Sequence, residues 1–207
     1  MPDVNTFVEA IRAKASGFSR FMVAIAGAPA SGKSTLAERL RDALIASGES
    51  AIVVPMDGFH YDDAILNARG HRPRKGAPHT FDAAGFEVLL KRIRTGESNI
   101  AIPVFDRSME LARAGADIVD DKAKFIIVEG NYLLLNLEPW NRLRPLFDLT
   151  IYLKVPLEEL EQRLVNRWLS LGFDMDYARN WIASNDILNI REVISNSATA
   201  DLVVEDF

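Results

Sequence analysis

The sequence predicts a three-layer α/β protein with a mostly parallel, five-stranded sheet covered by helices on both faces. Five short runs rich in β-branched residues are apolar without alternation, which is typical of strands buried on both faces. Helical patterns lie between several of these runs, and strands that alternate with helices favour a parallel sheet. The five runs are FMVAIAG (21–27), AIVVPM (51–56), KFIIVEG (124–130), LTIYLKV (149–155) and DLVVED (201–206).

The helices between these strands are indicated by the residues at their ends. A helix over 33–48 ends in a glycine, and a helix over 82–96 has Asp82 as its predicted N-cap and a glycine at its end. A helix over 156–172 carries Pro156 at its predicted first position, where a missing N–H costs little.

The length fits a single domain, predicted over residues 1–207, with room for a substantial core. A long polar insertion over 57–123 interrupts the alternation, and it holds its own helix and a short strand, NIAIPVF (99–105). No shift in composition and no repeat marks a domain boundary. We therefore expect the insertion to belong to the same domain as the sheet.

Composition excludes several classes of function. The net charge of −5 argues against general binding to nucleic acid or to a membrane surface. The chain has no cysteine, so disulfides, thiolate catalysis and Cys-bound metals are excluded. The apolar runs are too short to span a membrane, and residues 1–15 resemble an amphipathic helix rather than a signal peptide. We expect a cytoplasmic protein.

The strongest motif is GAPASGKS, Gly27 to Ser34, directly after the first strand and before a helix. It fits G-x-x-x-x-G-K-[ST] at every fixed position, which predicts a loop whose backbone N–H groups face phosphate oxygens. Lys33 would reach the β- and γ-phosphates, and the Ser34 hydroxyl would ligate Mg²⁺. The predicted nucleotide-binding residues of this loop are Gly27, Ala28, Ala30, Ser31, Gly32, Lys33, Ser34 and Thr35.

The phosphate loop leaves the class of nucleoside triphosphate protein open, and missing motifs narrow it. The sequence has no N-K-x-D guanine-recognition motif, which argues against a signalling GTPase. It has no L-S-G-G-Q stretch, which argues against a transporter-type ATPase. Phosphoryl transfer to a small molecule or to a nucleotide remains.

Asp57 follows the second strand and is the candidate for the acceptor side of this chemistry. In a parallel sheet, ligands gather outside the carboxyl ends of the strands, so Asp57 is expected near the phosphate loop. A carboxylate there can orient an attacking hydroxyl and accept its proton. The alternative is an aspartate that merely closes a turn.

A cationic loop follows, with Arg69, Arg72, Arg74 and Lys75 inside seven positions of an otherwise acidic chain. The loop leaves the Asp57 strand end and returns at Asp82, so it should lie over the place where acceptor and γ-phosphate meet. We expect Arg74 and Lys75 to position an anionic group, and the alternative is a solvated surface loop.

The order of the motifs GAPASGKS, MDGFHY, KGAPHTFD, IPVFDRS and IIVEGNYLLL resembles that of the P-loop kinases that include uridine kinase, type I pantothenate kinase and phosphoribulokinase. The resemblance covers about residues 20–206 and is strongest to bacterial proteins named as fructose transport system kinases. It implies the P-loop fold, with the five strands in the order 2-3-1-4-5 and residues 21–27 in the middle.

The resemblance also implies roles for single residues. Asp57 matches the candidate base of pantothenate kinases, and Phe105 of IPVFD matches a residue that packs on the acceptor. Glu129 matches an acid near Mg²⁺ or the acceptor, with capping of the next turn as the alternative. The acceptor-binding residues implied in this way, together with those of the cationic loop, are Phe59, His60, Arg74, Lys75, Phe105, Arg107, Glu129, Asn185 and Asn189.

Family kinases also carry arginines in a lid, which the resemblance places over about 160–185. Arg163 would bind ATP, and Arg167 would stabilise charge on the transferring group as a catalytic residue. The alternative is a pair of surface arginines making i,i+4 contacts with neighbours such as Glu159. Trp168 and Trp181 are interpreted as core or lid packing.

Together these features predict an enzyme that uses ATP and Mg²⁺ to phosphorylate a hydroxyl of a small metabolite, namely a sugar, a vitamin or a nucleoside. A nucleoside monophosphate kinase and a P-loop regulatory ATPase without an acceptor are the alternatives. The expected partner is the small-molecule acceptor, not nucleic acid or a membrane. Pairing as a homodimer is left open.

Overall fold

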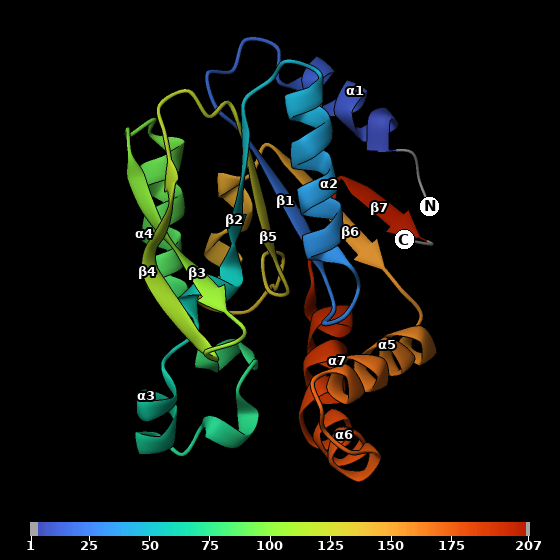
Figure 1. Cartoon of the computed structure of the whole chain (residues 1–207). Helices are drawn as coiled ribbons and strands as arrows, with labels where there is room; N and C mark the ends of the chain where they lie inside the picture. The colour runs from blue at the N-terminus through green and yellow to red at the C-terminus, as the bar shows by residue number, and fades with distance from the viewer. Residues whose placement is uncertain (1–3, 206–207) are drawn as a thin grey trace.

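The computed structural model describes residues 4–205 and has a five-stranded parallel sheet at its centre (Figure 1). The strand order is β2-β5-β1-β6-β7. If only the five strands of this sheet are numbered along the chain, the order is 2-3-1-4-5, which confirms the prediction with β1 in the middle. The predicted last strand reached Asp206, which lies outside the described residues. The strands are β1 (Phe21–Gly27), β2 (Ala51–Pro55), β5 (Phe125–Gly130), β6 (Leu149–Lys154) and β7 (Leu202–Glu205).

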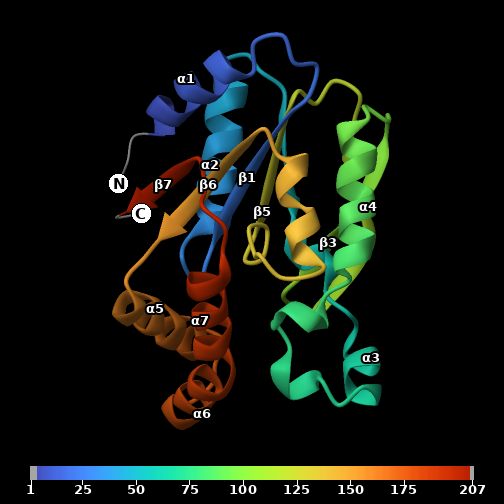
Figure 2. The ribbon, with the colours of Figure 1, turned by 180° about the vertical axis from the view of Figure 1, so that it is seen from behind.

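Helices cover both faces of the sheet, as Figure 1 and the reverse view in Figure 2 show. In the described part of the chain, no helix is long and apolar enough to cross a membrane. A π-helical turn over Ile182–Asp186 joins the last two helices. The α-helices are α1 (Val4–Lys14), α2 (Lys33–Ala46), α3 (Asp63–Ala68), α4 (Ala83–Arg94), α5 (Leu157–Ser170), α6 (Met175–Trp181) and α7 (Ile187–Asn196).

The central strand is buried along its whole length, and its side chains supply two separate cores. Because successive side chains of a strand point to opposite faces, Val23 and Ile25 pack with α1 and α2, whereas Met22 and Ala24 face α4 and α7. This two-sided burial is the reason that the run lacks alternation of apolar and polar residues.

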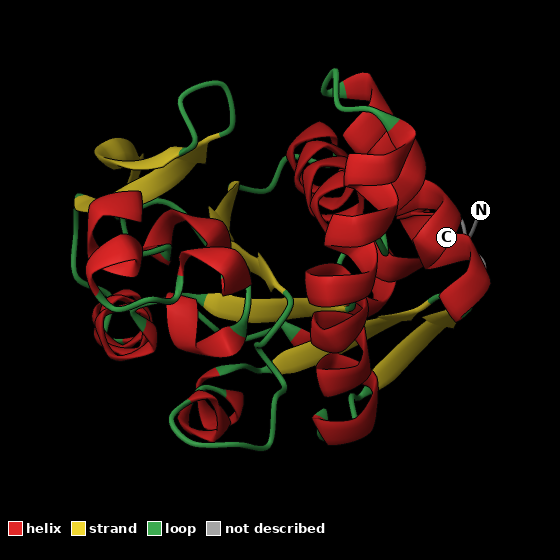
Figure 3. Ribbon diagram, turned by 90° about the horizontal axis from the view of Figure 1, so that it is seen from below, coloured by secondary structure: helices red, strands yellow, loops and turns green. Residues whose placement is uncertain are grey.

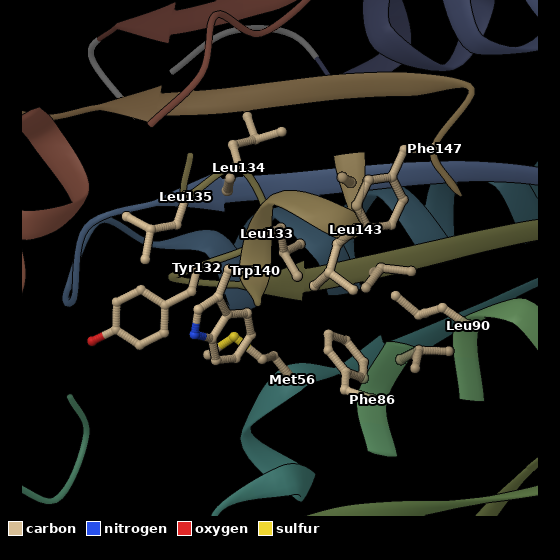
Figure 4. Close-up of a cluster of buried hydrophobic side chains, with 14 of the residues drawn as sticks. Met56, Phe86, Leu90, Tyr132, Leu133, Leu134, Leu135, Trp140, Leu143 and Phe147 are labelled. Atoms are coloured by element: carbon tan, nitrogen blue, oxygen red, sulfur yellow. The ribbon is translucent and has the colours of Figure 1, made fainter. Parts of the chain in front are cut away.

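The core under α4 contains an aromatic group that reaches the cationic loop (Figure 4). The rings of Phe81, Tyr132 and Trp140 lie within 6 Å of one another by centroid, with 5.3 Å between Tyr132 and Trp140. The Tyr132 hydroxyl donates a hydrogen bond of 2.5 Å to the carbonyl oxygen of Gly76. The loop is therefore anchored to the hydrophobic core.

The helix ends agree with the sequence signals except at one position. The Asp82 side chain accepts a hydrogen bond of 2.9 Å from the Gly85 N–H, so the predicted N-cap of α4 is confirmed. Gly96 follows the C-cap residue with φ of 80°, a left-handed conformation that favours glycine. Pro156 is the N-cap of α5 rather than its first helical residue, so that prediction was wrong by one position.

The insertion contains an antiparallel hairpin of which only the first strand was predicted. Strand β3 (Ile100–Asp106) pairs with β4 (Leu111–Val119), and the turn between them carries Arg107. Most of β4 is exposed, and its three alanines and one glycine are residue types that are depleted in strands, so the segment gives little sign of a strand. The hairpin lies beside α4 and packs on the 3-10 turn Met56–Phe59 that contains Asp57 (Figure 1).

Replacing Phe86 by alanine is expected to destabilise the fold by about 3–5 kcal/mol, because its fully buried ring would leave a cavity beside Phe59. The control is Val88→Ala on the same helix, since Val88 is 58% exposed and its loss should change stability by less than about 0.5 kcal/mol. Urea unfolding of both variants measures the difference, and equal losses would contradict this account of the core.

Candidate active site

Three charged side chains meet at the carboxyl edge of the sheet, the edge that Figure 3 views from below. The phosphate loop carrying Lys33 follows β1, and Asp57 lies in the 3-10 turn directly after β2. Strand β5 lies between β1 and β2, with Glu129 paired in register with Ile25 on one side and Pro55 on the other. Parallel pairing therefore brings together residues that are far apart in the sequence.

The loop after β1 has the tight backbone expected of a phosphate cradle. A Cβ added to Gly27 would lie 2.8 Å from the carbonyl oxygen of Leu153 and from Ser31 Oγ, so the position accepts only glycine without rearrangement. Gly32 has φ of 94°, and the fourteen-residue helix α2 begins at the next residue. The positive end of this helix points at the loop, which fits a phosphate ligand.

Lys33 is only 7% exposed, and its ammonium donates to the carbonyl oxygen of Ala28 at 2.9 Å. Burial lowers the pKa of Lys33 to about 8, against the attraction of Glu129 and Asp57, which raises it. The lysine is thus held against its own loop, where an incoming phosphate would replace the carbonyl oxygen as its partner.

Glu129 is also buried, and burial followed by the nearby charge of Asp57 raises its pKa to about 7. Lys33 and a hydrogen bond from Ser34 act in the opposite direction. A carboxylate and a hydroxyl oxygen are ligands that suit Mg²⁺. No cluster of three or more His, Asp or Glu side chains exists within residues 4–205, so a metal here would take its other ligands from phosphate oxygens and water.

Two adjoining cavities open at this edge. The first, of about 340 Å³, is formed by the phosphate loop together with Glu129 and Arg163. The second, of about 420 Å³, lies between the cationic loop and the helices α5 to α7. The residues that line both are Pro29, Asp57, Arg107, Asn131 and Arg167.

Asp57 stands on the wall shared by the two cavities, with its side chain 25% exposed. Its carboxylate accepts a charge-assisted hydrogen bond from the Arg107 guanidinium. Burial raises the pKa of Asp57, but the combined positive charge of Arg107 and other neighbours outweighs it, and the pKa lies below its usual range. Asp57 is therefore ionised near pH 7.

His60 lines the second cavity three residues further on. Its ring stacks on Phe81 at 3.9 Å by centroid, and burial lowers the pKa of His60 to about 4, so the ring is neutral near pH 7. The Nδ1 atom is buried without a hydrogen-bond partner. A buried polar atom left unsatisfied beside a cavity is suited to bind a ligand.

The cations of the loop are largely bound to the protein itself. Lys75 is buried and pairs with Asp63 at 2.8 Å and Glu110 at 3.0 Å. Arg74 donates to the carbonyl oxygen of Ser184 at 3.1 Å and to Asn189 Oδ1 at 2.9 Å. Lys75 borders the second cavity, whereas Arg74 lies outside it.

Of the remaining predicted acceptor residues, some line the second cavity and others lie outside it. Asn189 lines the second cavity, whereas Asn185 is 1% exposed and donates to the carbonyl oxygen of Lys75 at 2.8 Å. The Phe59 ring packs on Phe86 at 4.8 Å in the core and lines neither cavity. Phe105 also lines neither, but the Lys75 and Arg107 cations lie over its ring at 5.3 and 5.4 Å.

The two arginines of the predicted lid differ in their contacts. Arg163 donates to the carbonyl oxygens of Ala30 and Ser31, both at 3.3 Å, and also pairs with Glu159 at 2.6 Å. The contact with the phosphate loop and the i,i+4 contact thus coexist. Arg167, one helical turn later, lines both cavities.

An aromatic wall was missed by the sequence analysis, and it is formed by Trp168, Phe173, Tyr177 and Trp181 in α5, α6 and their connection. All four line the second cavity, and the Phe173 and Tyr177 rings stack at 4.3 Å. The Trp168 and Trp181 rings lie 5.7 Å apart by centroid. The spacing of four between Phe173, Tyr177 and Trp181 was the available signal, because residues four apart on a helix share a face. In the structure Phe173 lies in the connection before α6.

Binding of ATP without metal is expected to take up a proton at about pH 9. Lys33 has a pKa of about 8 in the free protein and is largely neutral above it, whereas contact with phosphate oxygens favours the charged form. Calorimetry in two buffers of different ionisation enthalpy measures the uptake. Lys33→Ala should lose it, and Lys91→Ala, at an exposed lysine paired with Glu87, should keep it. Equal uptake in all three proteins would assign the proton to another group.

Comparison with known proteins identifies the family of the chain. A model of the phosphoribulokinase / uridine kinase family matches residues 22–191, which include the phosphate loop, Asp57 and Glu129. The crystal structure of a "putative fructose transport system kinase" from Silicibacter sp. TM1040 has a TM-score of 0.93 and 40% identity, covering 99% of this chain and 100% of that chain.

Two relatives extend the comparison to sequence. A Schizosaccharomyces pombe protein named a "putative uridine kinase" is 35% identical over 200 residues, covering 90% of this chain and 83% of that protein. A pantothenate kinase of Mycolicibacterium vanbaalenii is 30% identical over 154 residues, covering 73% of this chain and 49% of that protein. The chain belongs to the phosphoribulokinase / uridine kinase family and is a P-loop kinase of small molecules.

Proposed function

We propose that the chain transfers the terminal phosphoryl group of ATP, in the presence of Mg²⁺, to a hydroxyl of a small metabolite. The observation that carries the proposal is the position of Asp57. This ionised carboxylate lies on the wall shared by the cavity of the phosphate loop and the cavity beside the cationic loop. Donor and acceptor would meet at the wall, within reach of the same group.

On the donor side, the loop backbone and the Lys33 ammonium would hold the phosphates, with Arg163 and Arg167 closing over them from α5. Ser34 and Glu129 would supply protein ligands for Mg²⁺, which neutralises charge on the phosphates when bound. The raised pKa of Glu129 supports this role, since a divalent cation favours the ionised carboxylate.

On the acceptor side, Asp57 would orient the attacking hydroxyl and accept its proton. The insertion over 57–123 would form one wall of the acceptor cavity, and the predicted lid over 160–185 would form the other, within one domain. His60 Nδ1, Lys75 and Asn189 would contact the polar groups of the acceptor.

The aromatic wall favours an acceptor with a flat or apolar part over a plain sugar. Four aromatic side chains offer ring faces on which a flat or apolar part of the acceptor can pack, and the polar side chains opposite them offer hydrogen-bond partners to the rest of it. The pairing of Lys75 with Asp63 and Glu110 disfavours an acceptor that already bears a phosphate. We therefore place a nucleoside or a vitamin ahead of a sugar or a nucleoside monophosphate.

An acceptor panel tests this function. Release of ADP from ATP is expected to rise with a nucleoside or with pantothenate, and to rise less with sugars or nucleoside monophosphates. The control is each metabolite without protein. No acceptor-dependent release with any metabolite would favour a regulatory ATPase, and stimulation by nucleoside monophosphates alone would favour a nucleotide kinase.

Asp57→Asn is expected to lower acceptor-dependent turnover by roughly a hundredfold or more, because the amide cannot accept the hydroxyl proton. The dissociation constant of ATP should change little, since Lys33 and the loop hold the triphosphate. Such a loss in kcat alone is the result of removing a transition-state interaction. Paired ATP titration and turnover measure it, with melting curves to confirm folding. Normal turnover in the folded variant would remove Asp57 from the mechanism.

A further inference from the structure

Arg107 is bound to the group that the proposed reaction needs. Its guanidinium donates to Asp57 Oδ2 although the two residues are 50 positions apart and lie on different elements. The nearer carboxylate, Asp106, is occupied by the Ser108 hydroxyl at 2.6 Å and by Arg113 at 3.4 Å. Asp106, which is next to Arg107 in the sequence, therefore already has hydrogen-bonding partners. Arg107 pairs instead with Asp57, on a different element.

This ion pair acts against the proposed role of Asp57. An arginine on one carboxylate oxygen occupies a lone pair that a hydroxyl proton would use, and its charge makes the carboxylate a weaker base. Lys33, His60 and Arg167 also face Asp57 from the loop, the same turn and α5, and Glu129 faces it from β5. Once nucleotide binds, the charge of Lys33 would be paired with phosphate. Arg107 would remain as the cation that is hydrogen-bonded to Asp57.

Resting on the proposed function, we propose that Arg107 is a positioning residue that restrains Asp57 until an acceptor hydroxyl displaces its guanidinium. Without an acceptor, water can enter the acceptor cavity and reach the terminal phosphate. If Asp57 were unrestrained, the water oxygen would bond to phosphorus as the bond from phosphorus to the ADP oxygen breaks, and the proton of water would pass to the carboxylate. The restraint suppresses this loss of ATP.

The geometry allows the restraint to be released. Arg107 sits in the turn of the hairpin with its side chain 55% exposed, so it can leave Asp57 without moving the sheet. The Asp57 side chain is the more buried partner, at 25% exposed, so the pair holds until an acceptor hydroxyl offers the carboxylate a replacement hydrogen bond. The guanidinium also lies over the Phe105 ring at 5.4 Å, which offers it a second contact next to the cavity.

Hydrolysis of Mg·ATP with water as the only acceptor tests the proposal, and it does not depend on knowing the metabolite. Arg107→Gln is expected to raise the hydrolysis rate by about tenfold, because the carboxylate regains basicity. Arg107→Lys, which keeps the charge, should restore most of the restraint. The matched control is Arg142→Gln, which removes an exposed ion pair with Glu138 away from Asp57 and should hydrolyse ATP at the wild-type rate.

The double variant Asp57→Asn with Arg107→Gln separates this role from a structural one. If the gain passes through Asp57, the double variant should lose it. A rate for Arg107→Gln that is unchanged or lower, or a gain that survives in the double variant, would overturn the proposal. Failure of the acceptor panel with a clear gain in Arg107→Gln would instead reject the proposed transfer reaction and keep the restraint on Asp57.

Discussion

The burial of one basic and two acidic side chains at the same edge of the sheet is the constraint on which the site depends. Lys33, Asp57 and Glu129 come from three neighbouring parallel strand ends. The charge of Lys33 lowers the pKa of both acids, and the charge of Asp57 raises the pKa of both Lys33 and Glu129. Burial lowers the pKa of Lys33 and raises that of Glu129, so the free site holds its charges under strain. Phosphate oxygens and a divalent cation would relieve both, which is the electrostatic preparation that phosphoryl transfer requires.

The cationic loop has a mainly structural role in the free protein, which explains why an acidic chain gathers positive charge there. Arg74 bridges to Asn189 and Lys75 is bound by Asp63 and Glu110. The Tyr132 hydroxyl and the Asn185 amide bind backbone carbonyls of the same loop. These contacts join the loop to the core, to the π-helical turn and to α7, so the two walls of the second cavity are held relative to each other.

The second cavity, between the cationic loop and the helices α5 to α7, has two kinds of wall. The insertion supplies the polar one, with His60, Lys75 and Arg107, and the segment from Trp168 to Trp181 supplies the aromatic one. Several apolar side chains of that segment are exposed, among them Phe173 at 40% and Tyr177 at 39%. A ligand that covers these rings would gain apolar burial as well as polar contacts, and this favours recognition of a molecule with one polar and one apolar side.

The sequence alone indicated the five strands of the sheet, the helices α2, α4 and α5, and the motif of the phosphate loop. The five apolar runs, the G-x-x-x-x-G-K-S motif and the Asp82 cap depend on contacts between residues close in the chain or on burial of a whole strand, and both leave a local pattern. Strand β4 was missed because its largely exposed alanines and glycine have a low strand propensity.

Tertiary structure decided which charged and aromatic side chains act together. Arg107 meets Asp57 across 50 positions, and Arg74 meets Asn189 across 115, so no spacing in the sequence could indicate either pair. The same holds for Phe59, which points into the core, and for the rings that line the cavity. A side chain's type limits what it can bind, but its partner is chosen by the packing of distant elements, and that packing exists only once the sheet has formed.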